Sequence, residues 1–331
     1  GLQTSYPSIE GKRIPWYNSR LPEELHNDAM VTSQALERME ALQGKPFFLA
    51  VGMVKPHLPF VAPSKYWDLY DPGKIVVPSP DKPDEYPSYA FTNWGELRKY
   101  HGIPAEGLLT DQDAKSMIHG YYACVSFIDA QVGRLTSKLK ELGLYDNTII
   151  VLWGDHGWKL GEYGDWCKHT NYELDTRIPV IVRVPDIKAG EGWKSNAIIE
   201  TVDIYPTLCD LAGLDLPGHL QGSSFRKVLE SEGADWNEVA FSQYPRTTRI
   251  NGKQTRVMGY SMRTPDYRIT RWVDHETRET IGTEIYDHRG SDPEMINLAA
   301  REEHKELINR LNKELDEQYA VEHAIDFLEF K

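Results

Sequence analysis

The run Thr-Ile-Ile-Val-Leu-Trp at residues 148–153 constrains the fold of this chain more than any other segment. A short, unbroken series of β-branched and apolar residues is typical of a buried strand in a parallel sheet. Gly-Asp-His-Gly follows it, and ligands in open α/β sheets bind just beyond the carboxyl ends of strands. Asp155 and His156 are metal-ligand types, and Lys168 adds a positive charge for an anion. The segment therefore predicts a metal-assisted site for a sulfate or phosphate ester, against the plainer alternative of a turn with a helix N-cap.

Helical and strand-like patterns alternate through the first 230 residues, which predicts an α/β architecture. The predicted helices span residues 22–43, 111–142 and 198–214, and the predicted strands span residues 46–54, 148–153 and 178–184. Lys-Pro-His-Leu-Pro at residues 55–59 predicts a loop, because proline removes the donors that a central strand needs. Residues 71–107 are rich in Pro, Gly, Tyr and Asp, and such a long irregular excursion predicts a functional loop or a lid.

The pattern changes at about Ser231, where short strand-like segments separated by turns begin. The predicted strands span residues 239–244, 258–263, 267–272 and 284–287, and a predicted amphipathic helix spans residues 302–319. Asn251-Gly252 is a strong signal for a hairpin turn. This part predicts a small antiparallel sheet with one covering helix, so the two predicted domains are residues 1–230 and 231–331.

Composition and charge exclude several classes of protein. The formal net charge of −13 and the lack of a basic stripe argue against nucleic-acid binding. No apolar stretch reaches the roughly 18 residues of a membrane span. Three cysteines do not make a disulfide framework; Cys124 and Cys209 are predicted to be buried thiols, and Cys167 to line a pocket. The lack of an Asn-x-Ser/Thr sequon favours a bacterial periplasmic or extracellular protein over a lysosomal one.

Several motifs, in one order along the chain, resemble those of a known family. Asp-His-Gly-Trp-x-Leu-Gly-Glu-x-Gly-x-Trp-x-Lys at residues 155–168 resembles the second metal-and-lysine motif of type I sulfatases, closest to the iduronate-2-sulfatase branch. Lys-Pro-His-Leu-Pro-Phe at residues 55–60 resembles the histidine loop of that family. Further similar segments are residues 177–182, 202–208, 242–246, 258–264 and 284–288. The resemblance implies an alkaline-phosphatase-like fold, in which a mostly parallel sheet lies between helices beside a smaller C-terminal α+β subdomain.

One motif of that family is missing from this sequence. Type I sulfatases carry Cys or Ser in a C/S-x-P-x-R motif, and its oxidation gives the formylglycine whose hydrate attacks sulfur. None of the cysteines here is followed by that pattern, and no Ser-x-Pro-x-Arg or early Asp-Asp metal pair occurs. The resemblance therefore implies that the N-terminal third is absent and that residues 1–230 are the later part of the large catalytic domain. A segment of the same enzyme, covalent or separately cleaved, would supply formylglycine.

The resemblance also implies roles for individual residues. The predicted metal ligands are Asp155 and His156, the predicted catalytic residues are His57 and Lys168, and the predicted substrate-binding residues are Lys55, Trp158 and Arg246. The metal would be Ca²⁺, with Mg²⁺ as the alternative. Lys168 would contact a sulfate oxygen, and His57 would protonate the leaving alcohol. Because both loops follow strands of one sheet, His57 and Lys168 are predicted to face one pocket. The plainer alternatives are a solvated lysine and a histidine bonded to backbone.

The function predicted from the sequence is removal of sulfate from a sulfated carbohydrate. A 2-O-sulfated uronate in a glycosaminoglycan or an algal polysaccharide is the substrate that the resemblance implies. One alternative is a phosphodiesterase or phosphonate-ester hydrolase of the same superfamily. The other is a catalytically dead fragment that only binds glycans. No nucleic-acid or membrane partner is expected, and the chain is expected to be inactive without the segment that carries formylglycine.

Overall fold

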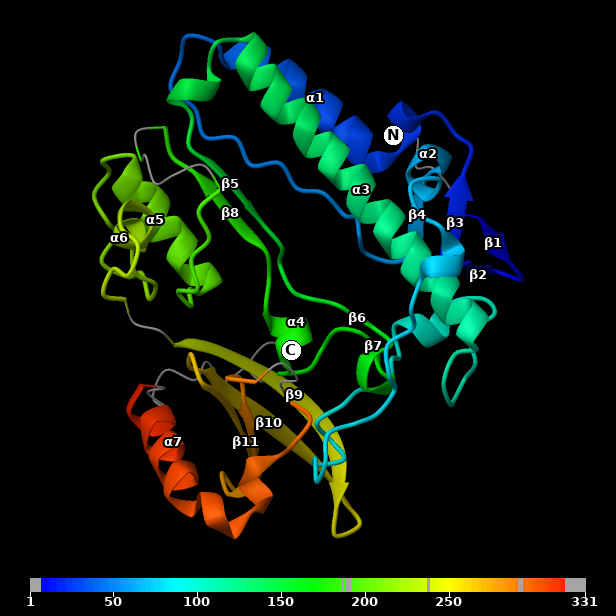
Figure 1. The fold of residues 1–331 in the computed structure, drawn as a ribbon, viewed down its shortest axis with the longest axis vertical. Helices are drawn as coiled ribbons and strands as arrows, with labels where there is room; N and C mark the ends of the chain where they lie inside the picture. Colours follow the sequence, from blue (N-terminus) through cyan, green and yellow to red (C-terminus); the bar gives the residue numbers. More distant parts are fainter. Residues whose placement is uncertain (1–6, 186, 188–191, 237–238, 291–293, 319–331) are drawn as a thin grey trace.

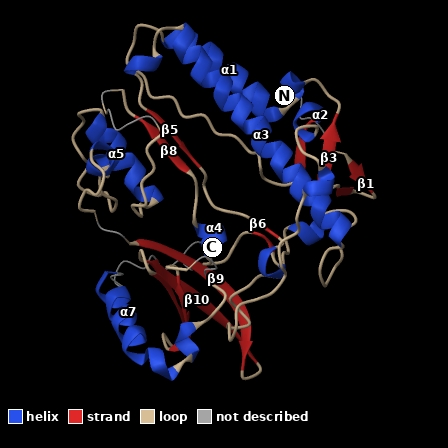
Figure 2. Ribbon diagram, in the orientation of Figure 1, coloured by secondary structure: helices blue, strands red, loops and turns tan. Residues whose placement is uncertain are grey.

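The computed structural model describes residues 7–185, 187, 192–236, 239–290 and 294–318. Figure 1 shows three groups of elements: helices α1 and α3, the β5–β8 strand pair beside α5 and α6, and a C-terminal sheet with helix α7. Figure 2 shows that loops connect these groups through most of the centre of the molecule. None of the described helices is both long enough and apolar enough to cross a membrane.

Helices α1 (Asn27–Leu42) and α3 (Asp111–Glu141) pack along one side, close to their predicted bounds. Thr110 caps α3, since its Oγ1 accepts a hydrogen bond from the Asp113 amide at 3.1 Å. Strand β3 (Trp16–Ser19) pairs in parallel with β4 (Phe60–Pro63), and both lie against α3. A Cβ at Gly120 of α3 would lie only 2.9 Å from Cβ of Phe60, so glycine permits this close contact.

Strand β5 (Ile150–Trp153) forms where the sequence predicts it, but its pairing differs from the prediction. It pairs antiparallel with β8 (Val180–Arg183), and among the described strands the β3–β4 pair is the parallel one. The strand is also not buried on both faces, because Trp153 is 47% exposed. An apolar run indicates an extended segment, but strand direction depends on which partner the chain brings alongside.

The predicted strand at residues 46–54 is not formed in the structure. These residues have no ladder partner among the described strands, and the Phe48 side chain is 81% exposed. The prediction was wrong because an apolar segment becomes a strand only where a neighbouring strand supplies its hydrogen bonds. The predicted helix at 198–214 is shorter, with a 3₁₀ turn at Thr201–Asp203 followed by α5 (Ile204–Leu211). Its start is fixed where Asp203 Oδ2 accepts from the Glu200 amide at 2.8 Å.

The C-terminal part is a four-stranded antiparallel meander, as predicted, with longer strands. The strands are β9 (Ala240–Ile250), β10 (Lys253–Arg263), β11 (Tyr267–Asp274) and β12 (Thr280–Asp287), in the order β12-β11-β10-β9. Asn251 and Gly252 both have positive φ, 51° and 80°, as a tight hairpin turn requires. Helix α7 (Lys305–Gln318) covers one face, where Leu311 and Leu315 are fully buried.

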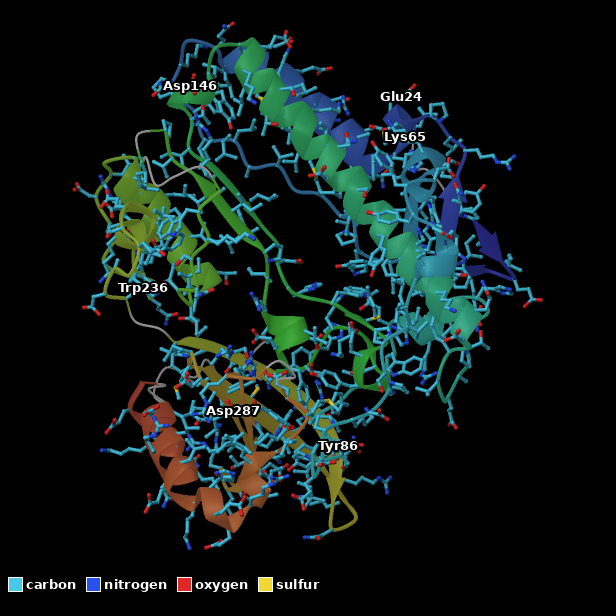
Figure 3. The ribbon with its side chains drawn as sticks, in the orientation of Figure 1. Glu24, Lys65, Tyr86, Asp146, Trp236 and Asp287 are labelled. Atoms are coloured by element: carbon cyan, nitrogen blue, oxygen red, sulfur yellow. The ribbon has the colours of Figure 1, made fainter. Side chains whose placement is uncertain are left out.

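The other face of this sheet packs against loops of the first part. Figure 3 places Tyr86 at this junction, and its ring meets that of Phe91 at 5.2 Å between centroids. Phe91 in turn stacks on Tyr172 at 4.5 Å. The buried Glu284 of β12 accepts hydrogen bonds from the Tyr172 hydroxyl at 2.6 Å and from Nε1 of Trp272 at 2.7 Å. The junction therefore fixes the long excursion and the loop after β5 against the sheet.

The remaining elements are short and lie mainly at the ends of loops. They are β1 (Ser8–Ile9), β2 (Lys12–Arg13), α2 (Ser64–Trp67), β6 (Lys159–Leu160), β7 (Trp166–Cys167), α4 (Glu173–Thr176), α6 (Arg226–Glu230) and 3₁₀ turns at Glu23–Leu25, Pro72–Lys74, Leu97–Lys99, Tyr145–Asn147, Glu162–Gly164, Leu298–Ala300 and Glu302–His304. Residues 71–107 contain only two of these turns among their described elements, as the sequence predicts. Trp236, labelled in Figure 3 beside α5 and α6, donates from Nε1 to the Ile198 carbonyl at 2.7 Å.

Candidate active site

His57 and Lys168 meet in the structure, as the sequence predicts. Nζ of Lys168 lies 3.0 Å from Nε2 of His57. Glu96, from the long excursion, contacts both: its Oε1 lies 3.0 Å from Nε2 of His57, and its Oε2 lies 2.9 Å from Nζ of Lys168. The hydrogen bond with His57 and the charge of Lys168 lower the pKa of Glu96 from its ordinary 4.5 to about 2. The three side chains form one charged cluster.

The backbone around His57 fixes how its ring can exchange protons. Its Nδ1 lies 2.8 Å from the Leu58 carbonyl, which can only accept, so Nδ1 carries a hydrogen. A neutral ring therefore presents the lone pair of Nε2 to the Lys168 ammonium, whereas a protonated ring donates from Nε2 to Glu96. The Nε2 atom is thus the one that can give or take a proton at the cluster.

Lys55 lies beneath the His57 loop and not among the residues that line the pocket. Its Nζ donates to the carbonyls of His57 and Pro59, both at 2.8 Å, and only 7% of the residue is exposed. Burial lowers the pKa of Lys55. Asp28 of α1, which the sequence did not single out, accepts from the Val54 amide at 2.7 Å. The contacts of Lys55 hold the loop, and its contact with a substrate stays a prediction.

Trp158 connects the charged cluster to the predicted metal ligands. Nζ of Lys168 lies 4.6 Å from the centre of the Trp158 ring, which is a cation–π distance. The rings of His57 and His156 lie 5.6 Å and 6.0 Å from it, centroid to centroid. Trp166, in contrast, is 2% exposed and packs in the core. Trp158 therefore contacts Lys168 and His57 of the charged cluster as well as His156.

Asp155 and His156, the predicted metal ligands, lie close to each other. The Asp155 side chain is 86% exposed, and its Oδ2 lies 3.6 Å from Nε2 of His156. Nδ1 of His156 donates to the Gly157 carbonyl at 2.8 Å, which leaves Nε2 as the acceptor of a neutral ring. Gly157 cannot carry a side chain, because a Cβ there would lie 2.0 Å from the Leu174 carbonyl oxygen.

These two residues supply only some of the ligands that a calcium site needs. Ca²⁺ takes about six to eight oxygen ligands, and an imidazole suits softer metals. The Asp155 carboxylate is a suitable ligand, but it and His156 supply two donors between them. The described residues around them therefore do not complete a calcium coordination sphere.

A pocket of about 480 Å³ opens beside the cluster. Its lining comes from three places in the chain, namely the excursion, β7 with the loop after it, and strand β9. It includes Thr92, Asn93, Glu96, Cys167, Lys168, His169, Tyr244 and Arg246. His57 is not among the lining residues, so only Lys168 of the predicted catalytic pair borders this pocket. Arg246 donates from Nε to the Tyr89 carbonyl at 3.1 Å and from Nη2 to the His169 carbonyl. Its guanidinium thus shapes the wall of the pocket, and the predicted clamp on a carboxylate stays a prediction. Burial raises the pKa of the Cys167 thiol.

Sequence reasoning missed Glu96, although it predicted that residues 71–107 form a functional loop or a lid. No motif distinguishes this glutamate from the other carboxylates of the excursion, because its role depends on folding against Lys168. The three buried cysteines agree with their predicted places, since Cys124 and Cys209 are enclosed and Cys167 borders the pocket.

Two family models match this chain. The model described as "Sulfatase" matches residues 2–214, and the model described as "N-sulphoglucosamine sulphohydrolase, C-terminal" matches residues 161–321. A curated relative named iduronate 2-sulfatase, from Homo sapiens, is 34% identical over 330 residues, which cover 82% of this chain and 60% of that protein. A relative named sulfatase, from Formosa agariphila, is 32% identical and covers 86% of this chain and 52% of that protein. The chain thus spans little more than half the length of these relatives.

Solved structures show the same fold at lower sequence identity. A phosphonate monoester hydrolase from Silicibacter pomeroyi has a TM-score of 0.77 and 24% identity, covering 97% of this chain and 65% of that one. A protein solved with its substrate D-glucosamine-2-N,6-O-disulfate has a TM-score of 0.72 and 24% identity, covering 91% of this chain and 72% of that one. These likenesses confirm the α/β, alkaline-phosphatase-like fold class, whereas the described strands do not form the mostly parallel sheet that was predicted. The predicted domain boundary after residue 230 stays a prediction.

Proposed function

The chain belongs to the type I sulfatase family, in its iduronate-2-sulfatase branch, and from that premise we propose that it acts as part of a sulfuric ester hydrolase on sulfated carbohydrates. The observation that carries the proposal is the meeting of His57, Glu96 and Lys168 beside an open pocket. A proton donor and a fixed cation lie within hydrogen-bond distance of each other, as cleavage of a charged ester requires.

Glu96 supports the assignment of an anion to this cluster. Its carboxylate bridges His57 and Lys168, so the two side chains can hold one anionic group between them. A sulfate ester also offers anionic oxygens and would take the place of the Glu96 carboxylate, because two anions at this spot would repel each other. Lys168 would then stabilise the negative charge that develops as the ester bond breaks. His57 would then protonate the leaving alcohol from Nε2. Trp158, under the Lys168 ammonium, would exclude water from one side.

The substrate that we propose is a 2-O-sulfated uronate in a glycosaminoglycan or an algal polysaccharide. The relatives named iduronate 2-sulfatase support the position of the sulfate, and the size of the pocket suits a sugar. The nucleophile would be formylglycine from a segment that carries C/S-x-P-x-R, since no such motif occurs among the 331 residues. That segment would also bring the ligands that complete a Ca²⁺ site with Asp155. Polysaccharides of this kind place the enzyme in the periplasm or outside a bacterial cell.

The test is ester hydrolysis by the purified chain, alone and joined to a segment that carries C/S-x-P-x-R. The substrates are a 2-O-sulfated uronate disaccharide, a 6-O-sulfated glucosamine and a phosphonate monoester, and ion chromatography measures the sulfate or phosphonate that is released. We expect turnover only with the joined segment, and preference for the 2-O-sulfate. Preference for the phosphonate would replace the sulfatase assignment, and turnover by the chain alone would refute the source of the nucleophile.

A further inference from the structure

Three charged residues without a part in the proposed reaction are buried next to the pocket. Lys159 and Asp165 are fully buried, and the side chain of Asp175 is 3% exposed. Nζ of Lys159 lies 2.5 Å from Oδ2 of Asp175 and 3.5 Å from Oδ2 of Asp165. Buried ion pairs add little stability compared with apolar residues of the same volume. Stability alone therefore does not account for this set, which we call the buried triad.

One side of the buried triad holds the backbone that carries Lys168. Lys159 pairs with Cys167 across strands β6 and β7, one residue before Lys168. Asp175 Oδ2 accepts from the Thr170 amide at 2.8 Å, two residues after Lys168. Between these points, Cys167 and His169 both have positive φ, 71° and 87°, a conformation that such residues rarely adopt. Contacts on both sides of Lys168 are therefore needed to keep this strained backbone in place.

The other side of the buried triad holds the excursion that carries Glu96. Oδ1 of Asp165 accepts a hydrogen bond from the Thr92 hydroxyl at 3.0 Å. The same hydroxyl oxygen accepts from the Trp94 amide at 3.1 Å, and the Trp94 ring is buried in the core. Glu96 follows two residues later. Lys159 thus lies between two carboxylates, each of which holds one of the two loops that meet at the cluster.

We propose that Lys159, together with Asp165 and Asp175, positions Lys168 and Glu96 relative to each other, so that the site presents its cation to the sulfate group. The inference deepens the proposed function and rests on it. The buried triad touches no substrate, and its members are positioning residues. Removal of the Lys159 ammonium is expected to loosen the loop that carries Lys168 and the loop that carries Glu96, because this ammonium contacts both carboxylates.

The test uses two variants of the buried triad, one control variant and one reference variant, all in the full chain. Lys159→Met removes the ammonium and keeps the length of the side chain; burial already raises the pKa of Asp165, so that carboxyl can become neutral without unfolding the chain. Asp175→Asn is the milder change. Leu311→Ala, in the core under α7, is the control, because it destabilises the chain away from the site. Amide hydrogen exchange and the affinity for inorganic sulfate are measured well below the melting temperature, with Lys168→Ala as the reference for the anion site.

We expect both triad variants to exchange amide hydrogens at least tenfold faster at residues 92–96 and 165–171, and to lose at least tenfold in sulfate affinity. Leu311→Ala should change neither, even where it lowers the melting temperature as much. Unchanged exchange in these two segments would overturn the proposal, as would equal changes in the Leu311 variant. If Lys168→Ala binds sulfate as well as the unsubstituted chain, the anion site itself fails, whereas the exchange result still decides whether the triad holds the loops.

Discussion

Two clusters in this molecule combine a histidine with at least one glutamate and one basic side chain, and they differ in exposure and in the partners of their carboxylate oxygens. In the first, His57, Glu96 and Lys168 lie beside the pocket, and the His57 side chain is 40% exposed. In the second, Glu173, His288 and Glu294 bring their ligand atoms within 4.8 Å of one another at the junction with the C-terminal sheet. By residue type, the second cluster resembles a metal site more closely than the first.

The contacts of the second cluster point to a structural role instead. Arg268 donates from Nη2 to Glu173 at 2.5 Å and from Nε to Glu294 at 2.7 Å, and Arg263 adds a contact to Glu173 at 3.3 Å. Two guanidinium groups thus already neutralise the carboxylates, and they would repel a cation. Glu173 opens α4, whereas the arginines lie at the ends of β10 and β11. The cluster therefore joins the two parts of the chain, and the comparison predicts loss of activity from one cluster and loss of stability from the other.

The largest effect is expected at Lys168. Lys168→Ala in the enzyme joined to its formylglycine segment should lower kcat by about 10²–10³-fold, the range seen when one charge-stabilising donor is removed. The free energy of unfolding should change by less than about 1 kcal/mol, since the partly exposed pair with Glu96 contributes little. The measurements are sulfate release and urea unfolding. Lys313→Ala, exposed on α7, is the control, and equal losses in both variants would remove the distinction between the clusters.

Substitution of Arg268 should lower the stability of the fold and leave the activity almost unchanged. Arg268→Met leaves the buried Glu294 and the partly buried Glu173 without their shared partner, and breaking a buried pair costs on the order of 3–5 kcal/mol. Sulfate release measured well below the melting temperature should stay within about twofold. Arg310→Met, which breaks an exposed pair on α7, should cost less than about 1 kcal/mol. A variant of Arg268 that kept its stability but lost its activity would contradict the structural role of this cluster.

The same contrast shows how much the sequence can predict. The meander at residues 240–287 was foreseen because each strand pairs with its neighbour in the chain, and Asn251-Gly252 marks the turn locally. The antiparallel pairing of β5 and the lack of a strand at residues 46–54 were not, because an apolar run does not specify which segment, if any, lies alongside it. His57 and Lys168 were found through motifs. Glu96 and the buried triad carry no local signal, since their roles arise only where separate loops meet.

The pH dependence of stability offers a third, smaller contrast. The pKa of Glu96 in the folded chain, about 2, lies below the ordinary 4.5 of the unfolded chain. Its contribution is therefore fully present above pH 4.5 and is lost as the pH falls towards 2. The difference in unfolding free energy between the unsubstituted chain and Glu96→Gln should be on the order of 1 kcal/mol at pH 7 and vanish only below pH 2. Urea unfolding at a series of pH values tests this; a difference that grows as the pH falls would contradict the assigned contacts.

The smallest expected effect is the change in melting temperature when a divalent metal is added. Asp155 and His156 offer two donors, and the carboxylates of the second cluster are already paired with arginines. Millimolar Ca²⁺ should therefore bind this chain only weakly and raise its melting temperature by less than about 1 °C, because a ligand near its dissociation constant contributes only a few tenths of a kcal/mol. Asp155→Asn should abolish even that shift, whereas Glu294→Gln should leave it unchanged. Calorimetry that found micromolar Ca²⁺ binding, lost in Glu294→Gln but kept in Asp155→Asn, would reverse the roles of the two clusters.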